Sequence, residues 1–368
     1  MHQLKEHCIC AHNSDVLQYI CKLLNICLVF GVVPGSFSHG ILIPILKKPC
    51  CDPSVPSNYR PITISTTLSK IMELHILDRG NGHEFSDCQF GFVPGRGTNM
   101  AIALAHDVIT HNTEKGATIY TCSLDAEGAF DAVPHSVLLD KARTVIPDEC
   151  WRLLIPWYKE LKVQIKWNDI IAPPISIMTG TRQGGLSSPY LFNLFYEGVV
   201  EILQSSDRGT RMNDNNFNVF CYADDLLLSS TTATGLQHMI DMANQYIISH
   251  GLTFNPSKTK CTVFGMCKLK NRPKWTINAI ELEEVDSIKY LGVTLANNSN
   301  RHVDERIRSC RRAFYALQGA GLCRKGVDPM VSSAILKAAV RPVLLYGMHC
   351  VYLNQKHKAD IERAQGNI

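Results

Sequence analysis

This chain of 368 residues is 45% hydrophobic and 19% charged, with a formal net charge of +4. Such a composition is ordinary for a globular protein, and 24 Gly with 17 Pro are too few for a fibrous or low-complexity chain. The longest apolar run, residues 19–33, includes a lysine and falls short of the ~20 apolar residues of a membrane span, so we expect no membrane partner. The 15 cysteines are odd in number and form no CxxC pair, which favours reduced thiols and an intracellular location, in the nucleus and cytoplasm.

Near the N-terminus, His7, Cys8, Cys10 and His12 form the one cluster whose spacing resembles that of a metal site. No second ligand pair follows at the spacing of a zinc finger. We therefore expect the edge of an amphipathic helix here, with the thiols acting as small hydrophobic side chains.

The first part of the chain, about residues 1–118, mixes helical periodicity with a proline-punctuated stretch at residues 44–61. Lys47, Lys48 and Arg60 lie along this stretch. A guanidinium can grip a triphosphate with two hydrogen bonds, and lysines can add point charges. Solvated basic side chains on a surface loop are an equally good interpretation of the pattern.

A second basic loop lies at residues 91–97 and contains Arg96. The neighbouring side chains Gln89, Phe90 and Phe92 could stack on a single nucleic-acid strand or form hydrogen bonds with it. This loop is therefore a candidate for nucleic-acid binding.

Residues 119–125 alternate in polarity and predict a β-strand. Its apolar face is expected to be buried, which makes Asp125 an acid on a rigid mount at the end of the strand. Asp131 follows after a turn, just before Pro134 begins a predicted helix. We interpret Asp131 as a cap or turn carboxylate.

A glycine-rich loop at residues 180–185 precedes a predicted apolar helix over residues 190–203. Ser188 can cap this helix, and Pro189 suits its first position. The glycines allow the backbone to approach a flat or anionic ligand closely. Because such loops are common before helices, this one gains weight only from its glutamine, its arginine and the nearby acids.

Two apolar runs, residues 219–222 and 226–228, predict a hairpin whose tip carries Asp224 and Asp225. A hairpin tip normally favours Gly or Asn, and adjacent carboxylates repel each other. An exposed acidic turn is the simple alternative. A divalent cation would relieve the repulsion, and Mg²⁺ prefers carboxylates together with substrate phosphates. If the fold brings Asp125 to this tip, the acids form a two-metal site suited to in-line displacement at phosphorus.

Lys258 and Lys260 follow the hairpin at some distance, after residues 254–256. A lysine beside a leaving pyrophosphate could protonate it. From the residues alone, solvated surface lysines are the better interpretation.

Basic residues dominate the C-terminal segment. From Arg301 onward the chain has 12 Lys and Arg against 5 Asp and Glu, whereas the preceding 300 residues have 25 against 28. A predicted helix there has an apolar stripe, with Arg308 and Arg312 pointing away from it. The stripe comprises Ile307, Cys310, Phe314 and Leu317. The positive segment suggests a polyanionic partner.

Strands interleaved with helices, followed by an all-helical end, predict an α+β fold with a helical appendage. A series of blocks, in this order and over nearly the whole chain, resembles the reverse transcriptases of non-long-terminal-repeat (LINE-type) retrotransposons. The blocks are NYRPI at residues 58–62, QFGFVPGRGT at 89–98, SLDAEGAFDAV at 123–133, GTRQGGLSSPYLFN at 180–193, CYADD at 221–225, GLTFNPSKTK at 251–260, YLGVTL at 290–295 and PVLLYG at 342–347.

The resemblance implies a right-hand polymerase architecture. Fingers would span residues 1–118, a palm 119–296 with an inserted fingers segment at about 137–178, and a helical thumb 297–368. The implied activity is that of an RNA-directed DNA polymerase, a nucleotidyltransferase that adds dNTPs to a DNA primer on an RNA template. The implied cofactor is Mg²⁺, two ions per site, with Mn²⁺ as a substitute.

The same resemblance assigns roles to individual residues. The implied metal ligands are Asp125, Asp224, Asp225 and the carbonyl of Ala126, with Lys258 as the acid on the leaving group. The implied nucleotide-binding residues are Lys47, Arg60, Phe130, Gln183 and Gly184, with Phe130 as the gate against a ribose 2′-hydroxyl. The implied template and primer contacts are Gln89, Gly91, Arg96, the primer grip Tyr290, Leu291 and Gly292, and Arg308 and Arg312 of the thumb.

The chain begins at a point resembling the middle of the fingers, ends within the thumb, and is short between Met72 and Gln89. We therefore expect a fragment of a polyprotein whose endonuclease region is absent from it. A catalytically inactive nucleic-acid-binding fragment is the alternative outside the enzymes, and a group II intron-type maturase is the alternative within them. A viral RNA-dependent RNA polymerase fits less well, because Phe130 as the gate predicts rejection of ribonucleotides.

Overall fold

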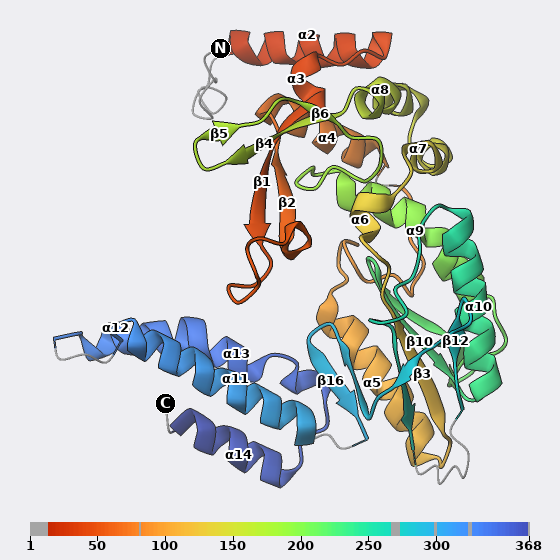
Figure 1. The fold of residues 1–368 in the computed structure, drawn as a ribbon, viewed down its shortest axis with the longest axis vertical. Helices are drawn as coiled ribbons and strands as arrows, with labels where there is room; N and C mark the ends of the chain where they lie inside the picture. The colour runs from red at the N-terminus through yellow and green to blue at the C-terminus, as the bar shows by residue number, and fades with distance from the viewer. Residues whose placement is uncertain (1–13, 81, 266–272, 298–299, 323–325, 367–368) are drawn as a thin grey trace. The chain divides into compact units, whose positions relative to one another are not determined.

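Two groups of residues pack separately along this chain. The computed structural model describes residues 14–80, 82–265, 273–297, 300–322 and 326–366 (Figure 1). The first unit comprises the residues up to Ser86, Ala126–Val199 and Tyr246–Thr253, and the second comprises Asp87–Asp125, Val200–Gln245 and the residues from Phe254 onward. The cluster from His7 to His12 considered above lies outside the described residues.

The sheet of the first unit is built on an antiparallel hairpin of β1 (His39–Leu46) and β2 (Tyr59–Ile64), with the 3₁₀ turn Pro56–Asn58 before β2. β4 (Lys162–Trp167) pairs in parallel with β1, and β5 (Ile170–Ile171) and β6 (Ile175–Ser176) pair antiparallel with β4. Pro44 lies beyond the part of β1 that pairs with β4, so its missing N–H removes no hydrogen bond from that ladder. The proline-punctuated stretch is therefore the end of a hairpin.

Most helices of the first unit bury one face, whereas residues 191–200 of α9 are buried on all sides. In α8 (Asp148–Lys159), Cys150, Leu153, Leu154 and Trp157 recur at helical spacing and are buried. The other helices are α2 (Ser14–Phe30), α3 (Gly35–Ser38), α4 (Thr67–Gly80), α6 (Ala129–Ala132), α7 (His135–Arg143) and most of α9 (Ser188–Gln204). The helices predicted after Pro134 and over residues 190–203 are thereby confirmed.

The sheet of the second unit has the strand order β14-β11-β3-β10-β9. Its strands are β3 (Ile119–Leu124), β9 (Val219–Tyr222), β10 (Asp225–Ser230), β11 (Lys260–Phe264) and β14 (Glu283–Glu284). The second unit also contains three separate two-stranded hairpins: β7 (Arg211–Met212) with β8 (Asn215–Asn216), β12 (Thr276–Ile277) with β13 (Ile280–Glu281), and β15 (Ser287–Tyr290) with β16 (Val293–Ala296).

β3 is the central strand of this sheet. Its predicted apolar face is buried, and Thr121 on the opposite face is buried as well, because β10 and β11 flank the strand and apolar side chains cover the sheet. α5 (Thr98–Glu114) runs alongside this sheet (Figure 1) and contributes Ile102, Ala105 and Val108 to the same core as Phe220 and Leu227. α10 (Ala233–Ser249) follows β10. Asp125 therefore ends a strand held rigidly on both edges.

The C-terminal segment is helical, as predicted. α11 (Asn300–Gly319), α12 (Pro329–Ile335), the π-helical turn Leu336–Val340, α13 (Arg341–Leu345), the 3₁₀ turn Met348–Cys350 and α14 (Gln355–Gly366) follow in order. α11, α13 and α14 lie side by side (Figure 1) around a core of their own. The predicted stripe of α11 faces that core, with Cys310 buried and Ile307, Phe314 and Leu317 packed against it. Mostly antiparallel sheets combined with helices confirm the α+β fold.

One described helical stretch, Pro329–Cys350, has the length and apolar composition to cross a membrane. Composition alone is weak support for a span, and Val340, Leu344 and Met348 of this stretch are buried in the core shared with α11. The expected absence of a membrane partner stays a prediction.

Candidate active site

Asp224 and Asp225 lie at the tip of the hairpin formed by β9 and β10. Asp225 pairs with Tyr222, which leaves Ala223 and Asp224 as a two-residue turn. Such turns require positive φ and favour Gly or Asn, yet Ala223 has a φ of 56°. The predicted hairpin is confirmed, and its tip holds a non-glycine residue in the left-handed region, which costs about 1–2 kcal/mol.

The register of β10 on β3 brings a third acid to this tip. Leu226 pairs with Leu124 in antiparallel orientation. Asp225, one residue before Leu226, therefore lies opposite Asp125, one residue after Leu124. Directly opposite residues of antiparallel strands have Cα atoms about 4.5–5.5 Å apart. The fold thus brings Asp125 next to Asp224 and Asp225, although it is distant from them in the sequence.

These acids repel one another. Burial, together with the charges of Asp225 and Asp125, raises the pKa of Asp224 to about 6. Burial and the charge of Asp125 also raise the pKa of Asp225, although its side chain keeps contact with solvent. A divalent cation between them would remove the repulsion.

One oxygen of the Asp125 carboxylate lacks a hydrogen-bond donor. Its Oδ2 is buried and accepts no hydrogen bond from the described residues. Lys258 Nζ lies 3.5 Å from the same oxygen. Lys258 reaches this position because the Asn255 N–H donates to the Asp125 carbonyl oxygen at 2.8 Å and the Lys258 N–H donates to the Asn255 carbonyl oxygen at 3.2 Å. The predicted acid and the predicted metal ligand therefore lie side by side.

A carboxylate oxygen that accepts no hydrogen bond and faces only a lysine at 3.5 Å, among converging acids, fits a divalent cation. Within the described part of the chain, no three His, Cys, Asp or Glu side chains are already gathered around one ion position. The acids would therefore have to close on a metal by rotation of their side chains. The carbonyl of Ala126, the next residue after Asp125, is the additional ligand that the sequence suggests.

The segment carrying Gln89, Gly91 and Arg96 packs against this hairpin. Gln89 is fully buried, and the adjacent Phe90 N–H donates to the Cys221 carbonyl oxygen at 2.8 Å. Arg96 donates to the Gln89 carbonyl oxygen at 2.8 Å and pairs with Asp87 at 2.9 Å. The prediction that Gln89 and Gly91 contact a nucleic-acid strand is corrected here, because both are buried under the hairpin. Of the aromatic side chains in this block, Phe92 is the exposed one.

A second correction concerns Tyr290, the first residue of the predicted primer grip. Its side chain is buried in the core of the second unit, and burial raises its pKa well above the usual value. Its neighbours Leu291 and Gly292 form the two-residue turn between β15 and β16, with φ values of 46° and 81°. Leu291 and Gly292 are half-buried, so these two residues of the predicted grip keep contact with solvent.

Tyr346, in the PVLLYG block, fixes that turn by donating a hydrogen bond from its hydroxyl to the Leu291 carbonyl oxygen at 2.7 Å. Tyr346→Phe is expected to lower the free energy of unfolding by about 1 kcal/mol, because it removes one hydrogen bond without changing the packing. Urea denaturation measures the loss. Tyr352→Phe, at an exposed tyrosine, is the matched control and should change nothing; equal losses in the two variants would contradict this role of Tyr346.

In the first unit, Lys47 and Arg60 lie at the end of the β1–β2 hairpin where the connecting loop joins the two strands, and both are exposed. Lys47 Nζ donates to the Ser57 carbonyl oxygen at 2.8 Å. The charge of Lys47 also acts on Asp131, whose pKa is nevertheless raised by burial. The expected basic anchors are therefore on the surface.

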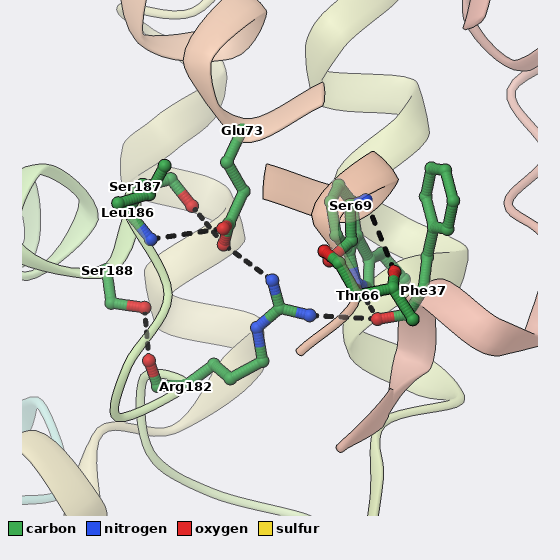
Figure 2. A network of polar contacts seen from close by, with 9 residues as sticks. Phe37, Thr66, Ser69, Glu73, Arg182, Leu186, Ser187 and Ser188 are labelled. Atoms are coloured by element: carbon green, nitrogen blue, oxygen red, sulfur yellow. Dashed lines mark hydrogen bonds and ion pairs between the residues drawn. The ribbon is translucent and has the colours of Figure 1, made fainter. Parts of the chain in front are cut away.

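Figure 2 shows how the loop before α9 is held. Arg182 is buried, and its guanidinium forms an ion pair with Glu73 of α4 at 2.7 Å and donates to the Phe37 carbonyl oxygen at 2.8 Å. The Glu73 carboxylate also accepts from the Leu186 N–H at 3.0 Å and the Ser187 hydroxyl at 3.1 Å (Figure 2). Ser188 donates its hydroxyl to the Arg182 carbonyl oxygen at 2.6 Å instead of capping the helix. A buried ion pair thus locks both ends of this loop.

Gln183 and Gly184 follow Arg182 in the loop. The Gln183 side chain donates to Asp131, and its carbonyl oxygen accepts from the Thr63 N–H at 2.8 Å. A Cβ on Gly184 would lie 2.3 Å from the Thr63 carbonyl oxygen, so only glycine fits. Asp131, expected as a cap, is the partner of Gln183, a role that its position in the sequence did not indicate. In the same unit, Phe130 stacks on Phe192 with ring centroids 4.0 Å apart.

Arg308 and Arg312 of α11 are exposed, on the side away from the buried stripe. Arg312 donates to the Ser309 hydroxyl at 3.0 Å. The helix therefore offers positive charge to solvent, as its periodicity predicts.

Comparisons with known proteins match most of the chain. Residues 45–295 match a family described as reverse transcriptase (RNA-dependent DNA polymerase). The chain is 25% identical over 348 residues to the RNA-directed DNA polymerase from mobile element jockey of Drosophila funebris, covering 91% of this chain and 37% of that protein. It is 25% identical over 287 residues to the Pol polyprotein of the type-2 retrotransposable element R2DM of Drosophila melanogaster, covering 74% and 26%. The chain thus spans about a third of the length of these relatives. A structure of apo telomerase from Candida tropicalis aligns with a TM-score of 0.48 at 9% identity, over 78% of this chain and 53% of that one.

Proposed function

Because the chain belongs to the reverse transcriptase (RNA-dependent DNA polymerase) family, we propose that it adds deoxynucleotides to a primer 3′-hydroxyl on an RNA template. It is homologous to the RNA-directed DNA polymerases of non-long-terminal-repeat retrotransposons. The observation that carries the proposal is the register of β10 on β3, which puts Asp125 opposite Asp225 and next to the turn that holds Asp224.

In this reaction the primer 3′-hydroxyl loses its proton to solvent, its oxygen forms a bond to the α-phosphorus, and the bond from that phosphorus to the pyrophosphate oxygen breaks. Asp125, Asp224, Asp225 and the Ala126 carbonyl would hold two Mg²⁺, with Mn²⁺ as a substitute. Bound Mg²⁺ would supply the positive charge that stabilises the attacking and leaving oxygens. Lys258 would donate a proton to the departing pyrophosphate. Its ammonium is on the same side of the sheet as Asp125, as their 3.5 Å contact supports.

We propose the remaining roles for exposed basic residues and for residues of the loop before α9. We assign residues 1–118 to the fingers, 119–296 to the palm with the insertion at about 137–178, and 297–368 to the thumb. Lys47 and Arg60 would bind the triphosphate, and the loop of Gln183 and Gly184 would contact the incoming nucleotide and the template base. The exposed Arg308 and Arg312 would contact phosphates of the template–primer duplex. An intracellular location, in the nucleus and cytoplasm, completes the proposal.

Phe130 is proposed as the gate that excludes a ribose 2′-hydroxyl. Phe130→Val is expected to relax the preference for dNTPs over rNTPs by about 10-fold or more, since a smaller side chain removes the steric clash and a one-group difference in a pocket is worth roughly 1–3 kcal/mol. The ratio of kcat/KM values for dNTP and rNTP measures the effect. An unchanged ratio in an active variant would show that another residue is the gate.

Primer extension tests the function itself. The purified chain, an RNA template with an annealed DNA primer, dNTPs and Mg²⁺ should give products whose sequence is complementary to the template. Omission of the template and addition of EDTA should each abolish them. Folded protein that binds the template–primer in a salt-sensitive manner but adds no nucleotide would overturn the proposal in favour of a catalytically inactive nucleic-acid-binding fragment.

A further inference from the structure

The turn that carries Asp224 has two sources of instability. Ala223 is held at a φ of 56°, a conformation that non-glycine residues rarely adopt. Asp224 and Asp225 are adjacent in the chain and Asp225 lies opposite Asp125, so three like-charged side chains meet at the hairpin tip. A strained turn of this kind persists only where surrounding groups hold it in place.

Gln89 supplies that support. Its Oε1 accepts two main-chain hydrogen bonds, from the Ala223 N–H at 3.0 Å and from the Gly91 N–H at 2.8 Å. Its Nε2 donates to Cys221 Sγ at 3.1 Å. Because both main-chain partners are donors, the oxygen of the carboxamide must face them, which fixes its orientation. A single side chain thus binds the turn and the strand that leads into it.

The backbone of the same segment adds a second restraint. Gln89 forms a parallel bridge with Cys221, and the Cys221 N–H donates to the Cys88 carbonyl oxygen at 2.9 Å. A Cβ on Gly91 would lie 2.4 Å from the Ala223 nitrogen and 2.9 Å from the Tyr222 carbonyl carbon. These are backbone atoms that cannot rotate aside, so the approach requires glycine.

We infer that Gln89 is a positioning residue that holds the turn Ala223–Asp224, and with it the two acids, at the geometry needed for metal binding. The inference rests on the proposed function for its catalytic consequence. Gln89 touches neither substrate nor metal, since it is fully buried. It acts through the main chain of Ala223, whose N–H has no other acceptor among the hydrogen bonds of the described residues.

Gln89→Met tests this role, because methionine has a similar volume and cannot accept the hydrogen bonds. Hydrogen exchange in the peptide 220–226 should become faster by about 10-fold or more, as the Ala223 amide loses its acceptor. Mn²⁺ binding to the free protein, followed by electron paramagnetic resonance, should weaken several-fold. In primer extension, kcat should fall by about 10–100-fold with the KM for dNTP nearly unchanged, as expected for misplaced catalytic groups.

Two further variants keep the test decisive. Gly91→Ala should displace the same turn by steric contact and reproduce the weaker Mn²⁺ binding, even if Gln89→Met does not fold. Thr262→Val is the control, because it removes a buried hydrogen bond to the Val285 carbonyl oxygen from the same sheet. It should lower stability without changing Mn²⁺ binding or the exchange of peptide 220–226.

The outcomes separate the inference from the function on which it rests. Equal Mn²⁺ binding and equal exchange in the wild type and both variants would overturn the positioning role, as would the same changes in Thr262→Val. A wild type that neither binds Mn²⁺ nor extends a primer would overturn the proposed function instead. In that case the exchange of peptide 220–226 alone decides whether Gln89 holds the hairpin.

Discussion

Asp224→Asn is expected to lower RNA-templated nucleotide addition by roughly 1000-fold or more and, at the same time, to stabilise the metal-free protein at neutral pH. The loss follows because an amide is a poor ligand for Mg²⁺, and metal stabilisation of the transition state is worth several kcal/mol. The gain in stability follows from the charges at the hairpin tip. Burial and the nearby Asp225 and Asp125 raise the pKa of Asp224 to about 6.

The size of this second effect depends on pH. A carboxyl group whose pKa is higher in the folded than in the unfolded state destabilises the fold wherever it is ionised. This cost is complete above pH 6 and vanishes below the unfolded pKa of about 4. Because Asp224 keeps some contact with solvent, we expect about 1–2 kcal/mol, less than the full shift implies.

Thermal unfolding in EDTA at pH 8 and at pH 4 measures the difference. Asp224→Asn should melt above the wild type at pH 8 and together with it at pH 4. Added Mg²⁺ should stabilise the wild type and leave the variant unchanged. Asp241→Asn, at an exposed carboxylate of α10, is the control and should change neither activity nor the pH dependence. A variant less stable than the wild type at pH 8 would mean that the acids do not repel one another in the folded protein.

Local sequence patterns predicted the strands that carry the acids and the C-terminal helix. Each of these elements shows a repeat of apolar and polar residues that can be recognised within a short stretch of sequence. The alternation over residues 119–125 became β3, and the apolar runs around Asp224 became β9 and β10. The stripe of α11 also faces its core as expected. Asp125 and Asp225 meet because of the register between β3 and β10, in which Leu124 pairs with Leu226. The resemblance to reverse transcriptases implied this meeting, but no local pattern does.

The roles of Gln89 and Tyr290 could not be predicted in this way. In a loop rich in glycine and arginine, a glutamine beside phenylalanines resembles a surface contact for a nucleic acid. Only the pairing of Gln89 with Cys221, 132 residues later, makes it an internal residue. Tyr290 is likewise buried by elements distant in sequence, among them α5. Such burial depends on the tertiary fold and cannot be predicted from the local repeat of apolar and polar residues.

The burial of Glu73 could not be predicted from the sequence either, because a glutamate within a helix is usually exposed to solvent. In the structure it is buried and pairs with Arg182 (Figure 2). Glu73→Ala is expected to lower the free energy of unfolding by about 3–5 kcal/mol, because it leaves the Arg182 guanidinium buried without its counter-charge. The Leu186 N–H and the Ser187 hydroxyl lose their acceptor in the same step. Activity should fall through a higher KM for dNTP, since the loop of Gln183 and Gly184 loses its restraint.

Chemical denaturation of a double-mutant cycle measures this interaction. Glu73→Met combined with Arg182→Met should cost much less than the sum of the two single changes, because replacing both partners of a buried pair leaves no unpaired charge. Glu149→Ala is the matched control, since it removes an exposed ion pair with Arg79 at 3.1 Å and should cost little, as solvent-screened ion pairs do. Additive costs in the cycle would mean that Glu73 and Arg182 stabilise the protein independently. The loop before α9 would then owe its position to its other hydrogen bonds, among them the main-chain bonds to Thr63 and Phe130.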